Sequence, residues 1–325
     1  MSKPQNVLYI VDDQNLLLGS LTDGDLRRAL LADHSLDESV TVAMNTEYTA
    51  VAEDQLNQQF ITFCRQKNIR TFPVINDRNE VKKIVQTDSY REIIPVHAVI
   101  MAGGKGERLK PLTLDTPKPM LIIGDKPIIE HNIDRLCRYG IKHLEISVSY
   151  LKEKIIDHFG TGESKDLNIR YIHEDNPLGT AGALGLVEDF KEDVILLMNS
   201  DLLTNIDFGD FYKTFLESEA DMAVATIPHV VDLPYAIMEL EQHKVISLKE
   251  KPRYTYFANA GIYLMKREIA EKIERETHLN ATTLMENVIK ENLHLINYPI
   301  IGYWLDIGKM NDYLKGQEDI KHINL

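Results

Sequence analysis

The segment Ala102–Leu121, AGGKGERLKPLTLDTPKPML, decides the fold prediction, because it combines glycines, bases and prolines directly after the apolar run His97–Met101. Gly103, Gly104 and Gly106 would let backbone N–H groups approach an anion that side chains would obstruct. An apolar strand followed by such a loop is typical of a ligand-binding α/β sheet. The segment therefore predicts a phosphate-binding loop at the carboxyl end of a strand.

Cations in the same segment favour a triphosphate ligand. Lys105 and Arg108 lie in the loop, and Lys118 lies between two prolines that stiffen its backbone. Two commoner loops are excluded, because Gly-x-Gly-x-x-Gly is absent and the residue after Lys105 is Gly106, not the Ser or Thr of a Walker loop. The alternative is a glycine-rich surface turn with solvated bases.

Composition restricts the partners of the chain. Its 325 residues are 44% hydrophobic and 26% charged, which is typical of a globular protein of two domains. The net charge of −14 predicts that neither nucleic acid nor an anionic membrane is a partner. Two distant cysteines, Cys64 and Cys137, and the lack of a signal-like or membrane-length apolar run lead us to expect a cytoplasmic enzyme.

The pattern of the chain changes near Pro95, which divides a domain of residues 1–94 from one of residues 95–325. The first part predicts a small α+β domain. Its expected strands are Val7–Val11, Leu16–Leu21, Thr71–Ile75 and Val81–Gln86, and its expected helices are Asp25–Ala32 and Glu53–Lys67.

An internal repeat runs through this first domain. Leu18–Asp25 and Lys83–Tyr90 both read as a strand that ends in a Thr-Asp turn. The repeat resembles the CBS-domain pair, with the first copy incomplete, and this resemblance implies that Thr22 and Asp25 contact the ribose of an adenosine nucleotide. The second copy departs from the pattern, because Tyr90 stands where Asp25 stands in the first. The alternative is a docking or oligomerisation module without a ligand.

After Pro95, strands and helices alternate, which predicts an α/β fold with a Rossmann-like, doubly wound mixed sheet. A helix over Ile128–Tyr139 would be capped by Asp125 and end at Gly140. The other expected helices are Leu151–Phe159 and Thr180–Phe190, and the expected strands are Val96–Met101, His143–Ser149, Asn168–Ile172 and Asp193–Met198.

Two acids are candidate magnesium ligands. Asp201 follows the apolar strand Asp193–Met198, and Asp306 lies in the otherwise apolar segment Tyr303–Gly308. Magnesium is usually held by one or two carboxylates and several waters, so this pair predicts a Mg²⁺ site. The alternatives are a helix N-cap for Asp201 and a salt-bridged turn for Asp306.

The segment between the loop and Asp201 predicts a site for the base. The small residues around Gly179 and Thr180 would open a helix N-terminus on which a ring or phosphate could rest, with close helix packing as the alternative. Glu174 could accept two hydrogen bonds from the N1 and N2 donors of guanine, whereas uracil or thymine offers one donor. This favours GTP.

Two later motifs predict a site for a phosphorylated sugar. Glu250 could accept sugar hydroxyls and Lys251 could bind the phosphate, although charge runs also occur in solvated hairpins. Asn259 and Gly261 interrupt the strand-like run Tyr256–Met265, which indicates a bulge, a close approach of ligand, or tight packing.

Together, residues 96–308 resemble the sugar-1-phosphate nucleotidyltransferase family. The motifs that carry the resemblance are Gly103–Leu109, Pro117–Pro119, Leu178–Gly182, Asn199–Asp201, Glu250–Pro252 and Trp304–Gly308. The resemblance implies a nucleotidyltransferase fold in which Ala102 to Gly106 and Arg108 bind the triphosphate and Lys118 contacts phosphate. It also implies that Asp201 and Asp306 bind Mg²⁺ and that Glu250 and Lys251 hold the sugar phosphate.

The resemblance further implies direct attack of a sugar 1-phosphate on the α-phosphorus of the nucleotide, with Arg108 and Lys118 stabilising the reacting phosphates. The segment Leu178–Gly182 looks most like guanylyltransferases, and the fused first domain is similar to bacterial glucosamine-1-phosphate guanylyltransferases. We therefore expect GTP, glucosamine 1-phosphate and a homo-oligomer. The alternatives are UTP or dTTP, mannose or heptose 1-phosphate, and a catalytically silent, nucleotide-sensing regulatory subunit.

Overall fold

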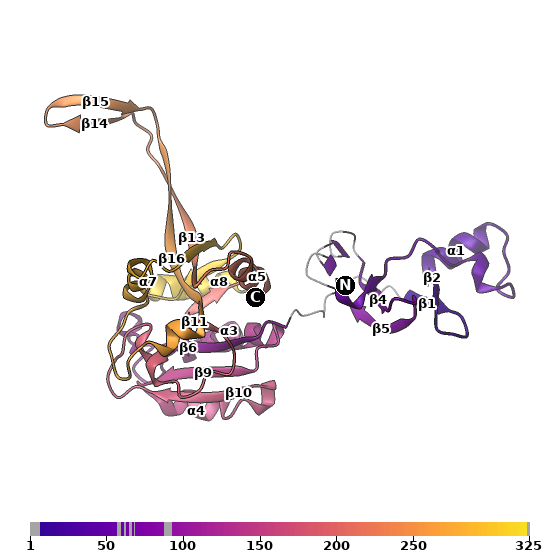
Figure 1. The fold of residues 1–325 in the computed structure, drawn as a ribbon, viewed down its shortest axis with the longest axis horizontal. Coiled ribbons are helices and arrows are strands. Elements are labelled where there is room, and N and C mark those ends of the chain that lie inside the picture. The colour runs from indigo at the N-terminus through magenta and orange to yellow at the C-terminus, as the bar shows by residue number, and fades with distance from the viewer. Residues whose placement is uncertain are drawn as a thin grey trace. The chain divides into compact units, whose positions relative to one another are not determined.

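The computed structural model describes residues 7–323 except 57–59, 62, 65–66, 68 and 88–92. The chain forms two compact units, Met1–Glu92 and Ile93–Leu325. Both units mix strands with helices (Figure 1).

The first unit is built from two small sheets. Strands β1 (Val7–Val11) and β2 (Leu17–Thr22) form an antiparallel pair, and β3 (Val51–Ala52), β4 (Thr71–Ile75) and β5 (Val81–Gln86) form a three-stranded sheet. Strands β1, β2, β4 and β5 confirm the sequence prediction, whereas β3 was not predicted. The expected helix over Glu53–Lys67 begins instead as the short 3₁₀ helix η2 (Glu53–Gln55), and part of its remainder lies outside the described residues.

The two copies of the repeat differ where their strands end. Thr22 caps helix α1 (Asp23–Leu31) in a capping box with Asp25, whose carboxylate accepts a 2.6 Å hydrogen bond from the Thr22 hydroxyl. Thr87 is buried, and its hydroxyl donates to the carbonyl of Ile69. The rest of the second copy, including Tyr90, lies outside the described residues.

The second unit contains a seven-stranded mixed sheet of order β10-β9-β6-β11-β16-β13-β17 (Figure 1). The first four strands are parallel, β16 is antiparallel to both of its neighbours, and β17 is parallel to β13. The bounds are β6 (Val96–Met101), β9 (His143–Val148), β10 (Asn168–His173), β11 (Val194–Asn199), β13 (Met222–Asp232), β16 (Arg253–Lys266) and β17 (Leu295–Pro299).

Helices cover both faces of this sheet, because its central strands are apolar on both sides. In β6, Ala98 and Ile100 pack into one core and Val99 packs into the other. Residues of α3 (Ile128–Arg138), α4 (Lys152–Phe159) and α5 (Phe208–Glu217) complete the first core, and residues of α6 (Arg267–Glu271) and α7 (Ala281–Lys290) complete the second. The prediction of helices on both faces of a mixed sheet is confirmed.

The start of α3 differs from the prediction. Asp125 does not cap this helix, because it lies in the turn between the short strands β7 (Ile122–Ile123) and β8 (Lys126–Pro127). Pro127 takes the N-cap position, with no side-chain hydrogen bond. The predicted end is confirmed, since Gly140 follows the helix with a left-handed φ of +69°.

The predicted helix over Thr180–Phe190 is wrong, because the segment forms only the 3₁₀ helix η6 (Gly182–Leu186). The N–H groups of Ala181 and Gly182 both donate to the carbonyl of Leu279, at 2.9 and 3.1 Å. The segment at the start of η6 therefore packs closely against the backbone that precedes α7. Glycine is needed for this approach, because a Cβ on Gly182 would overlap the carbonyl oxygen of Thr277.

A long ribbon leaves the sheet. Strands β13 and β16 continue their pairing as far as Asp232 and Arg253, and they carry the hairpin of β14 (Ile237–Glu241) and β15 (Lys244–Lys249) away from the helices (Figure 1). Near the C-terminus, β18 (Trp304–Asp306) pairs with β12 (Leu202–Thr204) and leads into α8 (Met310–Asp319). Among the described residues, no helix has the length and apolar character needed to cross a membrane.

Gly182→Ala tests the close approach of η6 to the segment before α7. We expect the added methyl to lower the free energy of unfolding by about 1–3 kcal/mol, since overpacking forces the backbone to shift. Urea unfolding followed by circular dichroism measures this change. Gly104→Ala is the matched control, because nothing lies within 4 Å of its Cβ position. Equal stability losses in both variants would contradict the packing role.

Candidate active site

A cavity of about 590 Å³ opens at the carboxyl ends of β6 and β11. We call it the crevice. The structure brings most of the predicted nucleotide and metal residues to its wall: Gly103, Gly104, Lys105, Gly106, Arg108, Lys118, Glu174, Gly179, Thr180 and Asp201. Ala102 is buried beside the loop, and Asp306 is held close to Lys118.

Two glycines of the loop have different roles. Gly106 has a left-handed φ of +64°, and a Cβ there would lie 2.9 Å from side-chain atoms of Lys118 and Thr113, so the fold itself requires glycine. The Thr113 hydroxyl also donates a 2.9 Å hydrogen bond to the Gly106 carbonyl. Gly104, in contrast, has open space at its Cβ position. Packing does not explain Gly104, and the open space suits a ligand that approaches the backbone.

Strand pairing brings the two aspartates together. Asp201 lies in the turn between β11 and β12, and Asp306 ends β18, where it pairs with Leu202. The N–H of Ile307 donates a 3.0 Å hydrogen bond to the carbonyl of Asp201. Because a strand follows Asp201, the alternative in which it caps a helix is excluded.

The ammonium of Lys118 connects these acids. Its Nζ forms an ion pair with Asp201 and lies 3.9 Å from Oδ1 of Asp306. Burial raises the pKa of Asp306, and the charge of Asp201 raises it further, whereas Lys118 and Arg108 oppose this shift. The charged form of Asp306 is therefore disfavoured by burial and by Asp201, and a positive charge beside it offsets this effect.

Two oxygens of this pair make no hydrogen bond with the described residues and have the chemistry that a hard divalent cation prefers. Oδ1 of Asp201 and Oδ1 of Asp306 are buried without a hydrogen-bond partner among the described residues. Across the same part of the chain, no three His, Cys, Asp or Glu side chains gather to form a metal cluster. A cation held here would take its remaining ligands from water and substrate, which is the usual coordination of Mg²⁺.

Asn132 supports the turn that carries Asp201, and the sequence prediction missed it. Its buried side-chain amide donates to the carbonyls of Ser200 and Leu202, at 3.3 and 2.9 Å. Asn132 therefore fixes the backbone on both sides of Asp201. The sequence feature that could have identified Asn132 is its place as a polar residue on the apolar face of α3, next to Ile133.

Glu174 points into the crevice and is already bound by the protein. Oε1 accepts a hydrogen bond from the Ser147 hydroxyl, and Oε2 accepts one from the N–H of Leu178 at 2.9 Å. A Cβ on Gly103 would lie 3.0 Å from Oε1, so the loop passes directly over this carboxylate. Each oxygen of a carboxylate can accept two hydrogen bonds, so each retains one site for a ligand.

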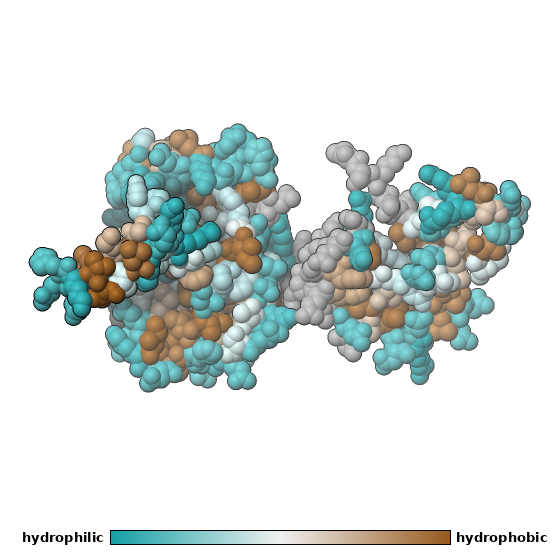
Figure 2. Space-filling view, turned by 90° about the horizontal axis from the view of Figure 1, so that it is seen from above, coloured by the Kyte–Doolittle hydropathy of each residue, from teal (hydrophilic) through white to brown (hydrophobic). Residues whose placement is uncertain are grey.

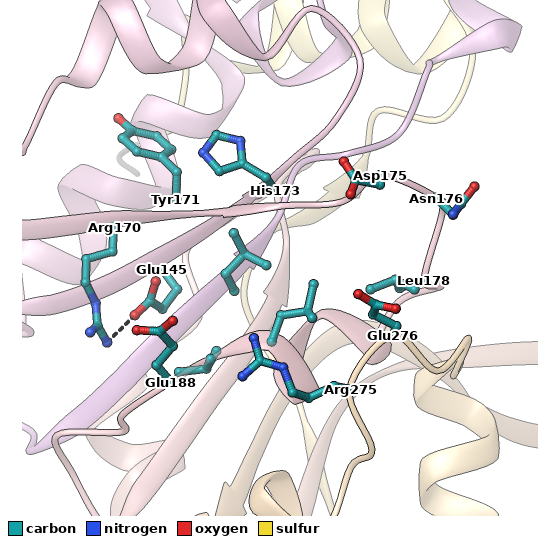
Figure 3. Close-up of a pocket in the computed structure, with 13 residues that line it drawn as sticks. Glu145, Arg170, Tyr171, His173, Asp175, Asn176, Leu178, Glu188, Arg275 and Glu276 are labelled. Atoms are coloured by element: carbon teal, nitrogen blue, oxygen red, sulfur yellow. Dashed lines mark ion pairs between the residues drawn. The ribbon is translucent and has the colours of Figure 1, made fainter.

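The residues beside Glu174 line a different cavity, of about 550 Å³ (Figure 3). His173 and Asp175 belong to its wall, whereas Glu174 belongs to the crevice. Its wall includes the ion pair of Arg170 with the buried Glu145. Acids outnumber bases around this cavity. The acids are Glu145, Asp175, Glu188 and Glu276, and the bases are Arg170 and Arg275. This balance disfavours a phosphate ligand there.

Gly179 and Thr180 line the crevice and also have packing roles. The φ of Gly179 is +79°, and a Cβ there would lie 2.6 Å from the carbonyl oxygen of Leu279. The Thr180 hydroxyl accepts a 2.9 Å hydrogen bond from the N–H of Ala281, the first residue of α7. Close packing, the alternative to a ligand role, therefore explains why small residues stand here.

Asn259 and Gly261 form the predicted bulge in β16. The register shifts between Val224 and Thr226 on the partner strand, and Gly261 has a φ of +73°. Asn259 accepts a hydrogen bond from the N–H of Gly261 at 2.9 Å. Neither lines the crevice, although a Cβ on Gly261 would lie 2.6 Å from Asn199, which does.

The structure does not bring Glu250 and Lys251 to the crevice of their own chain. Both side chains are exposed and follow β15, at the outer end of the ribbon. Among the described residues, neither side chain has a hydrogen bond or an ion pair. The fold of a single chain therefore does not account for the predicted contact of Glu250 and Lys251 with a sugar phosphate.

Comparison with known proteins agrees with this geometry. Residues 97–323 match the family model described as nucleotidyl transferase. A mannose-1-phosphate guanyltransferase of Yarrowia lipolytica is 31% identical over 229 residues, which cover 67% of this chain and 62% of that protein. A mannose-1-phosphate guanylyltransferase of Mycobacterium tuberculosis is 30% identical over 233 residues, covering 69% and 64%. The match thus spans less than two thirds of the length of these curated relatives.

Solved structures share the fold of the second unit. The HddC protein of Yersinia pseudotuberculosis aligns with a TM-score of 0.55 and 26% identity, covering 69% of this chain and 99% of that one. Its complex with GMP-PN aligns with a TM-score of 0.53. A putative glucose-1-phosphate thymidylyltransferase of Bacillus anthracis, 24% identical over 71% of this chain and 97% of its own, aligns with a TM-score of 0.58 and shares the fold.

Proposed function

The chain belongs to the nucleotidyl transferase family, and on that premise we propose that it transfers a nucleoside monophosphate from a nucleoside triphosphate to a sugar 1-phosphate. One observation carries the proposal: the glycine loop, Lys118 and Asp201 line one crevice, and Asp306 lies beside Lys118. Oδ1 of each aspartate is buried and has no hydrogen-bond partner among the described residues. Phosphate groups need cations and backbone donors, and a divalent cation needs carboxylates. Because the two cysteines of the chain lie far apart, as is common in a reducing compartment, we also propose that the reaction takes place in the cytoplasm.

In the proposed mechanism, the chain positions two phosphorylated substrates without forming a covalent intermediate. The loop residues from Ala102 to Gly106 hold the triphosphate, and Arg108 stabilises pyrophosphate as it leaves. Lys118 neutralises charge near the reacting phosphates. Mg²⁺, held by Asp201 and Asp306, would supply further charge neutralisation when bound.

GTP is the proposed nucleotide. Glu174 retains one acceptor site on each carboxylate oxygen, which suits the two neighbouring donors of guanine. The relatives named guanylyltransferases and the GMP-PN complex of HddC support the same base. Glucosamine 1-phosphate is the proposed acceptor, and mannose and heptose 1-phosphates are its rivals; no crevice residue distinguishes them.

Asp201→Ala tests the metal site. We expect turnover to fall by about 100-fold or more, because charge stabilisation at the reacting phosphates is lost. Pyrophosphate release is measured across a Mg²⁺ titration with each substrate pair. Asp157→Ala, an exposed change on α4, is the matched control. Unchanged turnover in Asp201→Ala would refute the metal assignment, and a native chain that turns over no pair would favour the regulatory subunit.

Glu174→Gln tests the base pocket. We expect kcat/KM for GTP to fall by about 10- to 100-fold, since a bidentate contact to a base is worth about 1–3 kcal/mol, while UTP and dTTP change little. The measurement compares all three nucleotides with a panel of sugar 1-phosphates. Glu153→Gln, exposed on α4, is the control. An unchanged preference would remove Glu174 from the pocket, and a native preference for UTP or dTTP would refute GTP.

We propose that the first unit is a CBS-like regulatory domain that binds an adenosine nucleotide. A groove of about 460 Å³ in this unit is lined by Asp25 and by Arg28, a base that could meet a phosphate. Thr22 is outside this lining and is engaged in the capping box. The competing role is assembly without a ligand.

Titration of the full chain with ATP and AMP, with GTP saturating the crevice, tests this role by calorimetry. We expect saturable binding that Arg28→Ala weakens by about 10- to 100-fold, because a charged hydrogen bond to phosphate is worth about 1.5–3 kcal/mol. Arg78→Ala, on an exposed turn of the same unit, is the control. Absence of saturable binding would leave this unit with a structural role.

A further inference from the structure

The ribbon and hairpin formed by residues 230–257 project from the second unit (Figure 1). We call these residues the arm. Thr226, which pairs with Asn259, is buried, and the ribbon continues from this pair to the pair of Asp232 with Arg253. At about 3.3 Å per residue, these pairs are about 20 Å apart. The arm therefore carries Glu250 and Lys251 well outside the crevice of their own chain.

The arm exposes an unusual amount of apolar surface. Eight large side chains are exposed by 50–75%: Tyr235, Met238, Leu240, Val245, Ile246, Leu248, Tyr256 and Phe257. Since an aromatic side chain carries about 150–250 Å², this set presents on the order of 800 Å². In Figure 2, hydrophobic residues gather on the projecting hairpin. Surface of this size matches what one partner buries in a stable complex.

The charge of the arm suits a second copy of this chain. Its acids are Asp232, Glu239, Glu241 and Glu250, and its bases are Lys244, Lys249, Lys251 and Arg253, so its net charge is zero. The chain as a whole carries −14. An acidic arm would be repelled by an acidic copy, whereas a neutral arm with an apolar surface is not.

The end of the arm has features of a ligand site. Lys251 has a left-handed φ of +41°, a conformation that is costly for residues with a side chain and that clusters at functional sites. Pro252 follows it and limits the backbone further. The adjacent Glu250 and Lys251 side chains lack partners within the described part of the chain, so both are available to another molecule.

We propose that the arm crosses to a second copy of this chain, where Glu250 and Lys251 complete the crevice by binding the sugar phosphate. This inference rests on the proposed function. Each copy has a crevice without these residues and an arm that offers them, so a two-fold exchange would complete both sites. The apolar side chains of the arm would be buried in the same exchange.

Complementation between two inactive variants tests the exchange. One is Asp201→Ala, which damages the crevice, and the other is Glu250→Gln with Lys251→Ala, which damages the arm. In an equal mixture after subunit exchange, hybrid dimers contain one intact crevice with one intact arm, so about a quarter of native turnover is expected. Activity no higher than that of the separate variants, while the native chain is active, would overturn the proposal.

A second test does not depend on activity. Chains with light and heavy isotopes are mixed, exchanged and treated with an amine cross-linker, and peptides joining Lys251 to the exposed Lys105 of the crevice are analysed by mass spectrometry. We expect cross-links that join light to heavy chains. Cross-links within one isotope alone would show an arm folded over its own crevice, and no such cross-link would show that the arm does not reach a crevice.

Sedimentation tests whether the apolar side chains of the arm, and not another surface, hold the dimer together. Leu240→Ser with Leu248→Ser should convert the native dimer to a monomer, whereas Leu314→Ser, equally exposed on α8, should leave it unchanged. A native chain that sediments as a monomer would overturn the proposal. If no substrate pair is turned over but mixed-isotope cross-links form, the proposed function fails and the exchange of arms stands.

Discussion

The site depends on one constraint: two carboxylates are held together against one ammonium. Pairing of β18 with β12 brings Asp306 to Asp201, and Lys118 lies between them. Two negative carboxylates held close together repel each other, and burial makes their charged forms still less favourable. The arrangement persists because Lys118 offsets the charge and Asn132 fixes the turn. Among the described residues, Oδ1 of each aspartate has no hydrogen-bond partner, which is the basis for the proposed cation site.

The two-faced sheet provides the framework for this arrangement. Apolar side chains alternate between two cores along β6 and β11, so the strands are locked in register on both faces. The same alternation at the end of β10 sends Glu174 to the crevice and its neighbours His173 and Asp175 to the other cavity. A shift of one residue would exchange these faces, so the position of Glu174 follows from the hydrophobic pattern of the strand.

The two incorrect predictions in the second unit have different causes, one distant in the sequence and one local. The run from Thr180 reads as a helix by itself, but Leu279 takes its first N–H groups and the chain tightens into η6. Asp125 reads as a cap, but a short pair of strands brings Pro127 to that position. Helical periodicity does not record the contact of η6 with Leu279, which is far away in the sequence, and a capping residue alone does not record the short strand pair around Asp125.

The sequence by itself determined most strands and helices between β6 and β11, the glycine loop, and the residues that could bind phosphate and metal. These follow from local properties: apolar alternation, glycine at Gly106, and bases or acids at strand ends. Only the tertiary structure decided that Asp201 and Asp306 meet, since strand pairing between distant segments is not encoded locally. It also decided that Glu250 and Lys251 stand apart from the crevice, because the length and direction of the ribbon emerge only when β13 and β16 pair.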